Sequence, residues 1–253
     1  MKQVIITSLF LLLNFSAVFS QDMSEDSKKA VINFINCVKN KDKEKLAEKI
    51  SFPLRRENPI PEIKNKQEFL KRYSEVFDDN LTQMIVNSKP SEDWSEMGWQ
   101  GIMLKDGEIW LDDNGSLTRV NYQSAIERKM KAKLVAGEKS GLHPSIKTFK
   151  GPVCILETKK YRIRIDDMGD GNYRYASWLL SAKMSDKPDM IIEKGEFIAD
   201  GSGGNHTYEF KNDGYVYDCH IIVMGERSSP PALLTISKGD KEILSQKAII
   251  VRQ

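Results

Sequence analysis

The stretch MGWQGIMLKDGEIWLDDNGSLTRVNY, residues 97–122, predicts three antiparallel β-strands joined by two tight turns. The Asp-Gly pair within residues 105–108 is a strong hairpin signal, because a two-residue loop needs positive φ at both of its central positions. A second turn follows at residues 113–115. Three such strands are stable only if other elements cover their hydrophobic face. We therefore expect helices from elsewhere in the chain to pack against this sheet.

Apolar residues recur at helical spacing in several segments around the predicted sheet. Asp42 and Asn65 stand where helix N-caps are expected, and Glu68 forms a capping box with Asn65. Pro53 cannot continue a helix, so residues 51–55 are predicted as a short edge strand. The predicted helices cover residues 27–38, 43–50, 65–77, 79–86 and 125–135.

Three runs in this half carry a resemblance to a known superfamily: INCVKNKDKEKLAEKISFPLR, IKNKQEFLKRYSEVF and GWQGIMLKDGEIWL. In element order and spacing they resemble small bacterial members of the NTF2-like superfamily, the cone-shaped α+β fold. The resemblance covers residues 27–122 and implies a curved sheet wrapped by helices, with a pocket inside the cone. Similar folds serve as isomerases, dehydratases, binding modules and interaction domains, so the fold alone assigns no function.

The second half of the chain is a succession of strand patterns separated by turn residues, spaced as in an antiparallel barrel or sandwich. Glycine and polar residues near 137–145 indicate the boundary between the halves. We predict an NTF2-like α+β domain at residues 21–139 and an antiparallel β-barrel or sandwich at 145–253. The strand patterns cover residues 153–157, 161–165, 173–180, 190–198, 206–211, 215–224, 233–237 and 242–251.

Residues 1–20 have the pattern of a signal peptide, with Lys2 ahead of an apolar run. We therefore expect an exported protein, periplasmic or secreted after cleavage. The run is shorter than the ~20 residues that span a bilayer, so no transmembrane anchor is expected. The net charge of +2 is close to neutral, and acids and bases are interspersed, which gives no electrostatic footprint for nucleic acid.

The chain has three cysteines. Cys154 and Cys219 both lie in the β-rich half, and an oxidising compartment allows them to form a disulfide if their strands are neighbours. The alternative is that they stay unpaired, because spacing alone does not establish connectivity. Cys37 falls in a helical pattern beside Phe34 and Val38 and is interpreted as a small hydrophobic residue.

The first candidate site is the predicted cone pocket. Arg56, Tyr73, Trp99 and Trp110 can line a cavity with aromatic walls and one cation, which suits a small organic or anionic ligand. The alternative interpretation is that the aromatic residues belong to the hydrophobic core and that Arg56 is a solvated strand end.

The second candidate is a face of the β-rich half. Arg162 and Arg164 alternate along one predicted strand, as do Arg174 and Trp178 along the next. If the two strands form a hairpin, these side chains make a patch that suits carboxylates or the anchor residues of a partner protein. The alternative is an ordinary solvated exterior.

Catalytic and metal-binding patterns are weak. No histidine precedes His143, although histidine most often serves acid–base catalysis at neutral pH. Residues 166–172 are acidic but place Met168 where a calcium loop needs an oxygen ligand, so we interpret them as a hairpin turn. Residues 200–205 are glycine-rich but no helix follows them, which indicates a flexible hairpin loop at a possible binding rim rather than a phosphate cradle. We expect no metal and no cofactor.

The leading functional hypothesis is a non-enzymatic exported protein of the cell envelope that binds a small molecule or an envelope protein. One alternative is a small-molecule-binding enzyme that uses the cone pocket. Another is an inhibitor or immunity-type protein that blocks an envelope hydrolase. Both alternatives stay open at the level of the sequence, because no catalytic motif decides between them.

Overall fold

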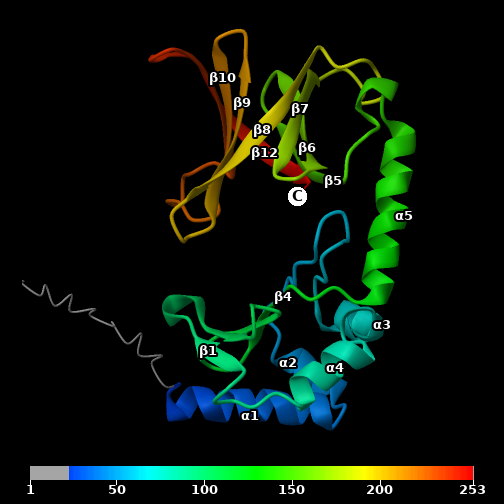
Figure 1. The fold of residues 1–253 in the computed structure, drawn as a ribbon, viewed down its shortest axis with the longest axis vertical. Helices are drawn as coiled ribbons and strands as arrows, with labels where there is room; N and C mark the ends of the chain where they lie inside the picture. Colours follow the sequence, from blue (N-terminus) through cyan, green and yellow to red (C-terminus); the bar gives the residue numbers. More distant parts are fainter. Residues whose placement is uncertain (1–22, 253) are drawn as a thin grey trace, which may run out of the picture.

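The computed structural model of the protein describes residues 23–252. Two lobes are joined along one side by a long helix (Figure 1). The predicted signal segment, residues 1–20, lies outside the described residues. Within residues 23–252, no helix is long and apolar enough to cross a membrane.

The helices of the N-terminal lobe begin at side-chain caps. Ser24, Asp42, Asn65 and Asp78 each accept a hydrogen bond from a backbone N–H in the first turn of the helix that follows. The predicted helices are thereby confirmed, with ends shifted by a few residues. They are α1 (Glu25–Lys39), α2 (Lys43–Glu48), α3 (Lys66–Val76) and α4 (Asp79–Val86).

The strands of residues 97–122 form part of a four-stranded antiparallel sheet. Its order is β1 (Trp94–Glu96), β2 (Ile102–Leu104), β3 (Ile109–Leu111) and β4 (Leu117–Val120). The predicted strand from residue 97 is wrong at its start, because Gly98–Gln100 form the 3-10 helix η1. The predicted two-residue loop is also wrong. Leu104 pairs with Ile109, which leaves a four-residue loop.

One face of this sheet is buried against the helices. Ile102, Leu104, Ile109 and Leu111 are fully buried in a core shared with α1 to α4, whereas Trp110 on the other face is half-buried. The period of two along each strand produces this separation. The predicted edge strand at residues 51–55 is reduced to two isolated bridges, at Ile50 and Leu54.

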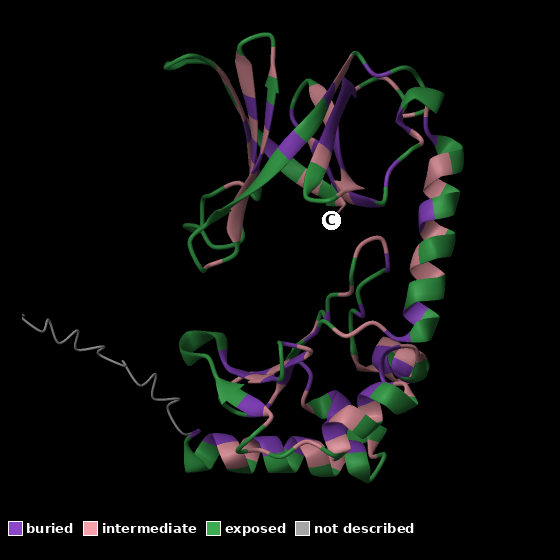
Figure 2. Ribbon diagram, viewed as in Figure 1, coloured by how far each residue is buried: buried purple, intermediate pink, exposed green. Residues whose placement is uncertain are grey.

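The helix α5 (Ala125–Gly141) connects the lobes. It is 17 residues long and so spans ~25 Å. Only Glu127 and Val135 of this helix are buried, as expected for a polar helix that bridges two domains (Figure 2). The helix runs past the predicted end at residue 135 and includes Gly137. After it come η2 (Pro144–Ile146) and a linker whose Phe149 packs on the barrel.

The C-terminal lobe is a closed antiparallel barrel of eight strands, which decides between the predicted barrel and sandwich. Each strand pairs with the next along the chain, and β12 pairs with β5 to close the ring. Tyr175, Phe210, Tyr217 and Cys219 fill the interior. All eight predicted strands are present: β5 (Gly151–Glu157), β6 (Tyr161–Gly169), β7 (Asn172–Leu179), β8 (Met190–Asp200), β9 (Asn205–Asn212), β10 (Tyr215–Ile221), β11 (Ala232–Lys238) and β12 (Lys241–Arg252).

Candidate functional site

The four residues predicted to line one cone pocket are not brought together. The guanidinium group of Arg56 is buried and donates to both carboxylate oxygens of Glu127, at 2.6 and 2.5 Å, and to the backbone carbonyls of Val120 and Tyr122. Tyr73 stacks on Phe77 in the hydrophobic core. Both residues therefore have structural roles, and only Trp99 and Trp110 line a common pocket.

The predicted arginine face is covered by the chain itself. Arg162 pairs in register with Trp178, and Arg164 with Ala176, so the expected hairpin and shared face are present. However, Arg164, Arg174 and Trp178 are only 1–2% exposed. The prediction of an accessible interaction face is thus wrong for these three residues, because the linker between α5 and β5 packs over them.

A buried carboxylate explains why two arginines are tolerated under the linker. Asp166 forms ion pairs of 2.6 Å with both Arg164 and Arg174, and the ring of Phe149 lies against both guanidinium groups. Asp166 was predicted in a hairpin turn but belongs to β6 and is fully buried. Arg162 lies at the edge of this region, where it pairs with Glu157 at 2.8 Å.

Of the two alternatives for Cys154 and Cys219, the structure shows the unpaired one. Cys154 lies on β5 and Cys219 on β10, and β11 and β12 separate these strands around the barrel. Both thiols are buried inside the barrel and free. Burial raises the pKa of Cys154 to about 12 and raises the pKa of Cys219 as well, so both remain protonated thiols at neutral pH.

The best candidate site is a cleft of about 450 Å³ between the two lobes, which we call the interlobe cleft. The N-terminal wall comes from the outer face of the β1–β4 sheet, and the C-terminal wall from the β8–β9 and β10–β11 loops. Its residues are Trp99, Gln100, Gly101, Trp110, Asp112, Asp113, Thr118 and Arg119 on one side and Ser202, Gly203, Gly204, Val223 and Met224 on the other.

The indole of Trp99 is 67% exposed, an unusual position for the largest hydrophobic side chain. Trp99 lies on η1, next to a turn at Gly101. No other residue can take the place of Gly101 unless the surrounding backbone rearranges. Gly101 has a φ of +96°, and a Cβ there would lie 2.2 Å from the carbonyl oxygen of Leu111. This close approach of the backbone holds Trp99 at the cleft beside Trp110.

The opposite wall is apolar and is held in place by one side chain. Val223 and Met224 are 51% and 55% exposed. The amide oxygen of Asn205 accepts hydrogen bonds from the N–H groups of both residues, each at 2.8 Å, and its amide nitrogen donates to the carbonyl of Met224. The β10–β11 loop is thus fixed at the cleft although its side chains remain accessible.

Some polar side chains at the cleft already have hydrogen-bond partners within the protein, and others do not. The carboxylate of Asp112 accepts hydrogen bonds from the N–H groups of Asn114 and Ser116 and so stabilises its own turn. Arg119 lies directly across from Trp110 on the neighbouring strand. Its exposed guanidinium group has no ion-pair partner among residues 23–252, which leaves it available to an anionic group.

Sequence reasoning identified one wall of the cleft but not the other. Trp99 and Trp110 were candidates, and residues 200–205 were predicted as a loop at a binding rim; three of these loop residues line the cleft. Arg119, Val223 and Met224 were missed. Val223 and Met224 fall at the end of the predicted strand 215–224, where the apolar run gives no signal that separates them from residues of the barrel.

No protein-family model, curated protein or solved structure matches this chain.

Proposed function

We propose that this chain is an exported, non-enzymatic binding protein of the cell envelope that holds a small organic ligand in the interlobe cleft. The observation that carries this proposal is the exposed indole of Trp99, which lines the cleft together with a second indole, Trp110, and the exposed thioether of Met224 from the other lobe. Solvent-exposed aromatic and apolar groups that converge on one concave surface are typical of ligand sites.

The chemistry of the walls indicates the class of ligand. Two indoles and a methionine favour a ligand with a flat apolar or aromatic group. Aromatic rings stack on one another, and the flexible thioether of methionine packs against ring edges. Arg119 adds one cation that suits a carboxylate or sulfonate, although the same wall also carries the exposed carboxylate of Asp113. The volume of about 450 Å³ lies within the ~300–1,000 Å³ usual for small-molecule sites.

The assignment of the N-terminal lobe to the NTF2-like superfamily belongs to this proposal. Helices packed on one face of a short antiparallel sheet support it. The ligand that we propose binds on the opposite face of that sheet rather than inside a cone, since the inner face is occupied by core residues such as Ile102 and Leu104.

The experiment is a titration of the protein with 8-anilinonaphthalene-1-sulfonate, a planar aromatic anion whose fluorescence rises in apolar sites. We expect Trp99→Ala to weaken binding by about tenfold, because it removes most of one wall, worth ~1.5 kcal/mol or more. Ile249→Ala is the control, since Ile249 is a large apolar residue on β12 that is also more than half exposed but does not line the cleft.

Equal binding by wild type and Trp99→Ala would overturn the proposal. Native mass spectrometry of the same two proteins, isolated from their own cells, provides a second readout. We expect a bound small-molecule mass on the wild type that Trp99→Ala loses, and a stoichiometric protein in place of that mass would contradict a small-molecule function.

A further inference from the structure

The accessible charge of α5 is entirely basic. Its two acids are withdrawn into ion pairs: Glu127 with Arg56, and Glu138 with Arg164 and Arg252, at 2.5 to 3.0 Å. The remaining charged residues of the helix are Arg128, Lys129, Lys131, Lys133 and Lys139. The helix therefore presents five cations and no accessible carboxylate to solvent.

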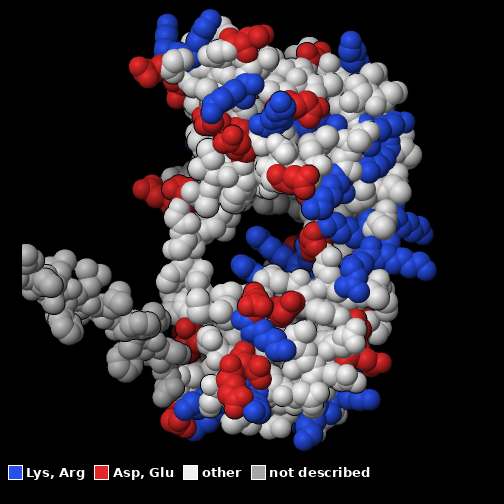
Figure 3. Space-filling model, viewed as in Figure 1, with Lys and Arg blue, Asp and Glu red and all other residues white. Residues whose placement is uncertain are grey.

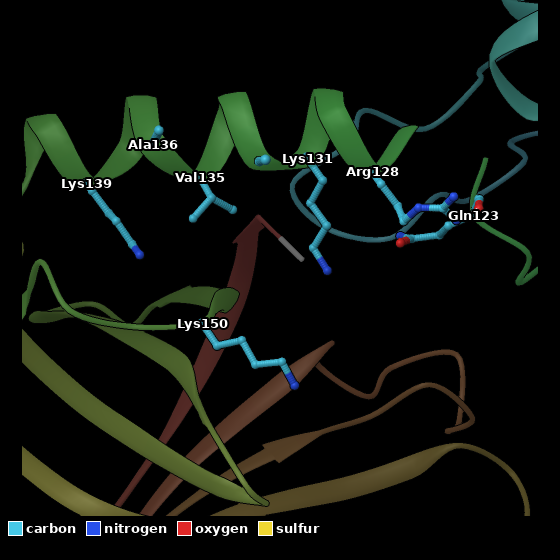
Figure 4. Close-up of a pocket in the computed structure, with 8 residues that line it drawn as sticks. Gln123, Arg128, Lys131, Val135, Ala136, Lys139 and Lys150 are labelled. Atoms are coloured by element: carbon cyan, nitrogen blue, oxygen red, sulfur yellow. Dashed lines mark hydrogen bonds between the residues drawn. The ribbon is translucent and has the colours of Figure 1, made fainter. Parts of the chain in front are cut away.

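Part of this charge gathers in a hollow of about 370 Å³ between α5 and the start of the barrel, which we call the basic groove. Figure 4 shows Lys131, Val135 and Lys139 directed into it from α5, with Lys150 lying on the opposite side. Arg128 and Gln123 lie at one end. Ala132, Val135 and Ala136 supply an apolar floor between the cations.

The dimensions of the basic groove suit an extended chain. Arg128 and Lys139 are eleven residues apart on one helix, which corresponds to ~16 Å of rise. An extended peptide covers that distance with about five residues, at ~3.3 Å each. In Figure 3, basic side chains line the α5 side of an opening between the lobes, so the groove is reached from solvent.

The protein itself already places a carboxylate against two residues of this groove. Glu57, from the loop before α3, accepts hydrogen bonds from the ammonium group of Lys131 and from the side-chain amide of Gln123. Its side chain is 53% exposed, so it can leave without disrupting the core. The other cations have weaker engagements: Lys150 lies 3.8 Å from Asp167, and Lys139 lies over the ring of Phe149.

We propose that the basic groove binds an acidic peptide segment of a partner protein, with acidic residues flanking an apolar one, and that Glu57 occupies one end of the groove in the free protein. The cations match the carboxylates, and the floor around Val135 matches the apolar residue. The apolar floor and the length favour a peptide over a phosphate polymer, which has no apolar group to bury. This site shares no residue with the interlobe cleft.

The test is fluorescence anisotropy with a labelled seven-residue peptide that carries glutamates on both sides of a central leucine. We expect Lys131→Glu and Lys150→Glu each to weaken binding by about tenfold, since each reversal replaces an attraction by a repulsion. Glu57→Gln should tighten binding by about threefold because it frees Lys131 and Gln123. Lys133→Glu is the matched control, an identical change on α5 outside the groove.

Several outcomes decide the matter. Equal weakening by Lys133→Glu and Lys131→Glu would mean general attraction to a basic helix and would overturn the groove. Tripolyphosphate that competes as well as the peptide, or a leucine-to-serine peptide that binds equally, would overturn the peptide assignment. Trp99→Ala should leave peptide binding unchanged, so that a failure of the cleft proposal and a failure of this one are distinguishable.

Discussion

The buried ion pair between Arg56 and Glu127 ties the N-terminal lobe to α5, and its removal tests the structural interpretation of Arg56. The side chains are 2% and 0% exposed. Arg56→Ala leaves the Glu127 carboxylate and two backbone carbonyls, those of Val120 and Tyr122, without their donors. A buried charge whose partner is removed typically costs ~3–5 kcal/mol. We therefore expect the free energy of unfolding of this lobe to fall by about 4 kcal/mol.

The double variant Arg56→Met with Glu127→Leu separates the effect of an unpaired buried charge from the effect of the lost hydrogen bonds to backbone carbonyls. Because it removes both charges, only the two carbonyls remain unsatisfied, and we expect a smaller loss of about 1–3 kcal/mol. The effects of the two single variants should thus not add. Arg119→Ala is the control, an exposed arginine on β4 whose removal should change stability by less than ~0.5 kcal/mol.

The assay is urea denaturation followed by tryptophan fluorescence, because Trp94, Trp99 and Trp110 all report on the N-terminal lobe. The urea concentration at the midpoint of unfolding should fall. The dependence of the free energy of unfolding on urea concentration, which scales with the surface exposed on unfolding, should stay constant. Two results would refute the reasoning. One is a loss of stability below about 1 kcal/mol for Arg56→Ala. The other is a double variant whose loss of stability equals the sum of the losses of the two single variants; either result would favour the interpretation of Arg56 as a solvated strand end.

Two further predictions concern backbone and thiol chemistry. Gly101→Ala should destabilise the N-terminal lobe strongly, because its Cβ would lie 2.2 Å from the Leu111 carbonyl oxygen. Gly98 also has a positive φ but has open space around it, so Gly98→Ala should cost only ~1 kcal/mol. Thermal denaturation of the two variants measures the difference. Burial raises the pKa of Cys154 from 9.0 to about 12. The unfolded chain then loses this proton first, so the free energy of unfolding should fall between pH 9.0 and 12. Cys154→Ala should make this fall less steep without abolishing it, because burial raises the pKa of Cys219 as well. In the native protein at pH 8, only Cys37 should react with a thiol reagent.

Much of the local structure could be predicted from short-range patterns. Side-chain caps at Asp42 and Asn65 and the period of 3.6 residues located the helices, and alternation located all eight strands of the barrel. These signals depend on neighbours in the chain, so one sequence is enough to detect them. The turn at residues 105–108 was less predictable, because positive φ angles fall at Lys105 and Gly107, whereas the predicted two-residue loop needs them at Asp106 and Gly107.

The functional surfaces needed contacts between distant segments. Arg164 and Arg174 alternate along their strands as exposed residues would, and only the linker that carries Phe149 buries them. Similarly, Arg56 pairs with a residue 71 positions away. Neither pairing leaves a periodic signal, because burial of a charge depends on what packs over it and not on its own strand or helix.

The sequence by itself determined which segments form helices and strands, because hydrogen bonding and side-chain alternation within a segment depend on local residue order. Only the tertiary structure decided that the eight strands close into a barrel, that Trp99 of one lobe and Met224 of the other line one cleft, and that Glu57 reaches Lys131 on α5. These arrangements depend on which hydrophobic faces bury one another across the chain, and that choice is made by the packing of the whole molecule.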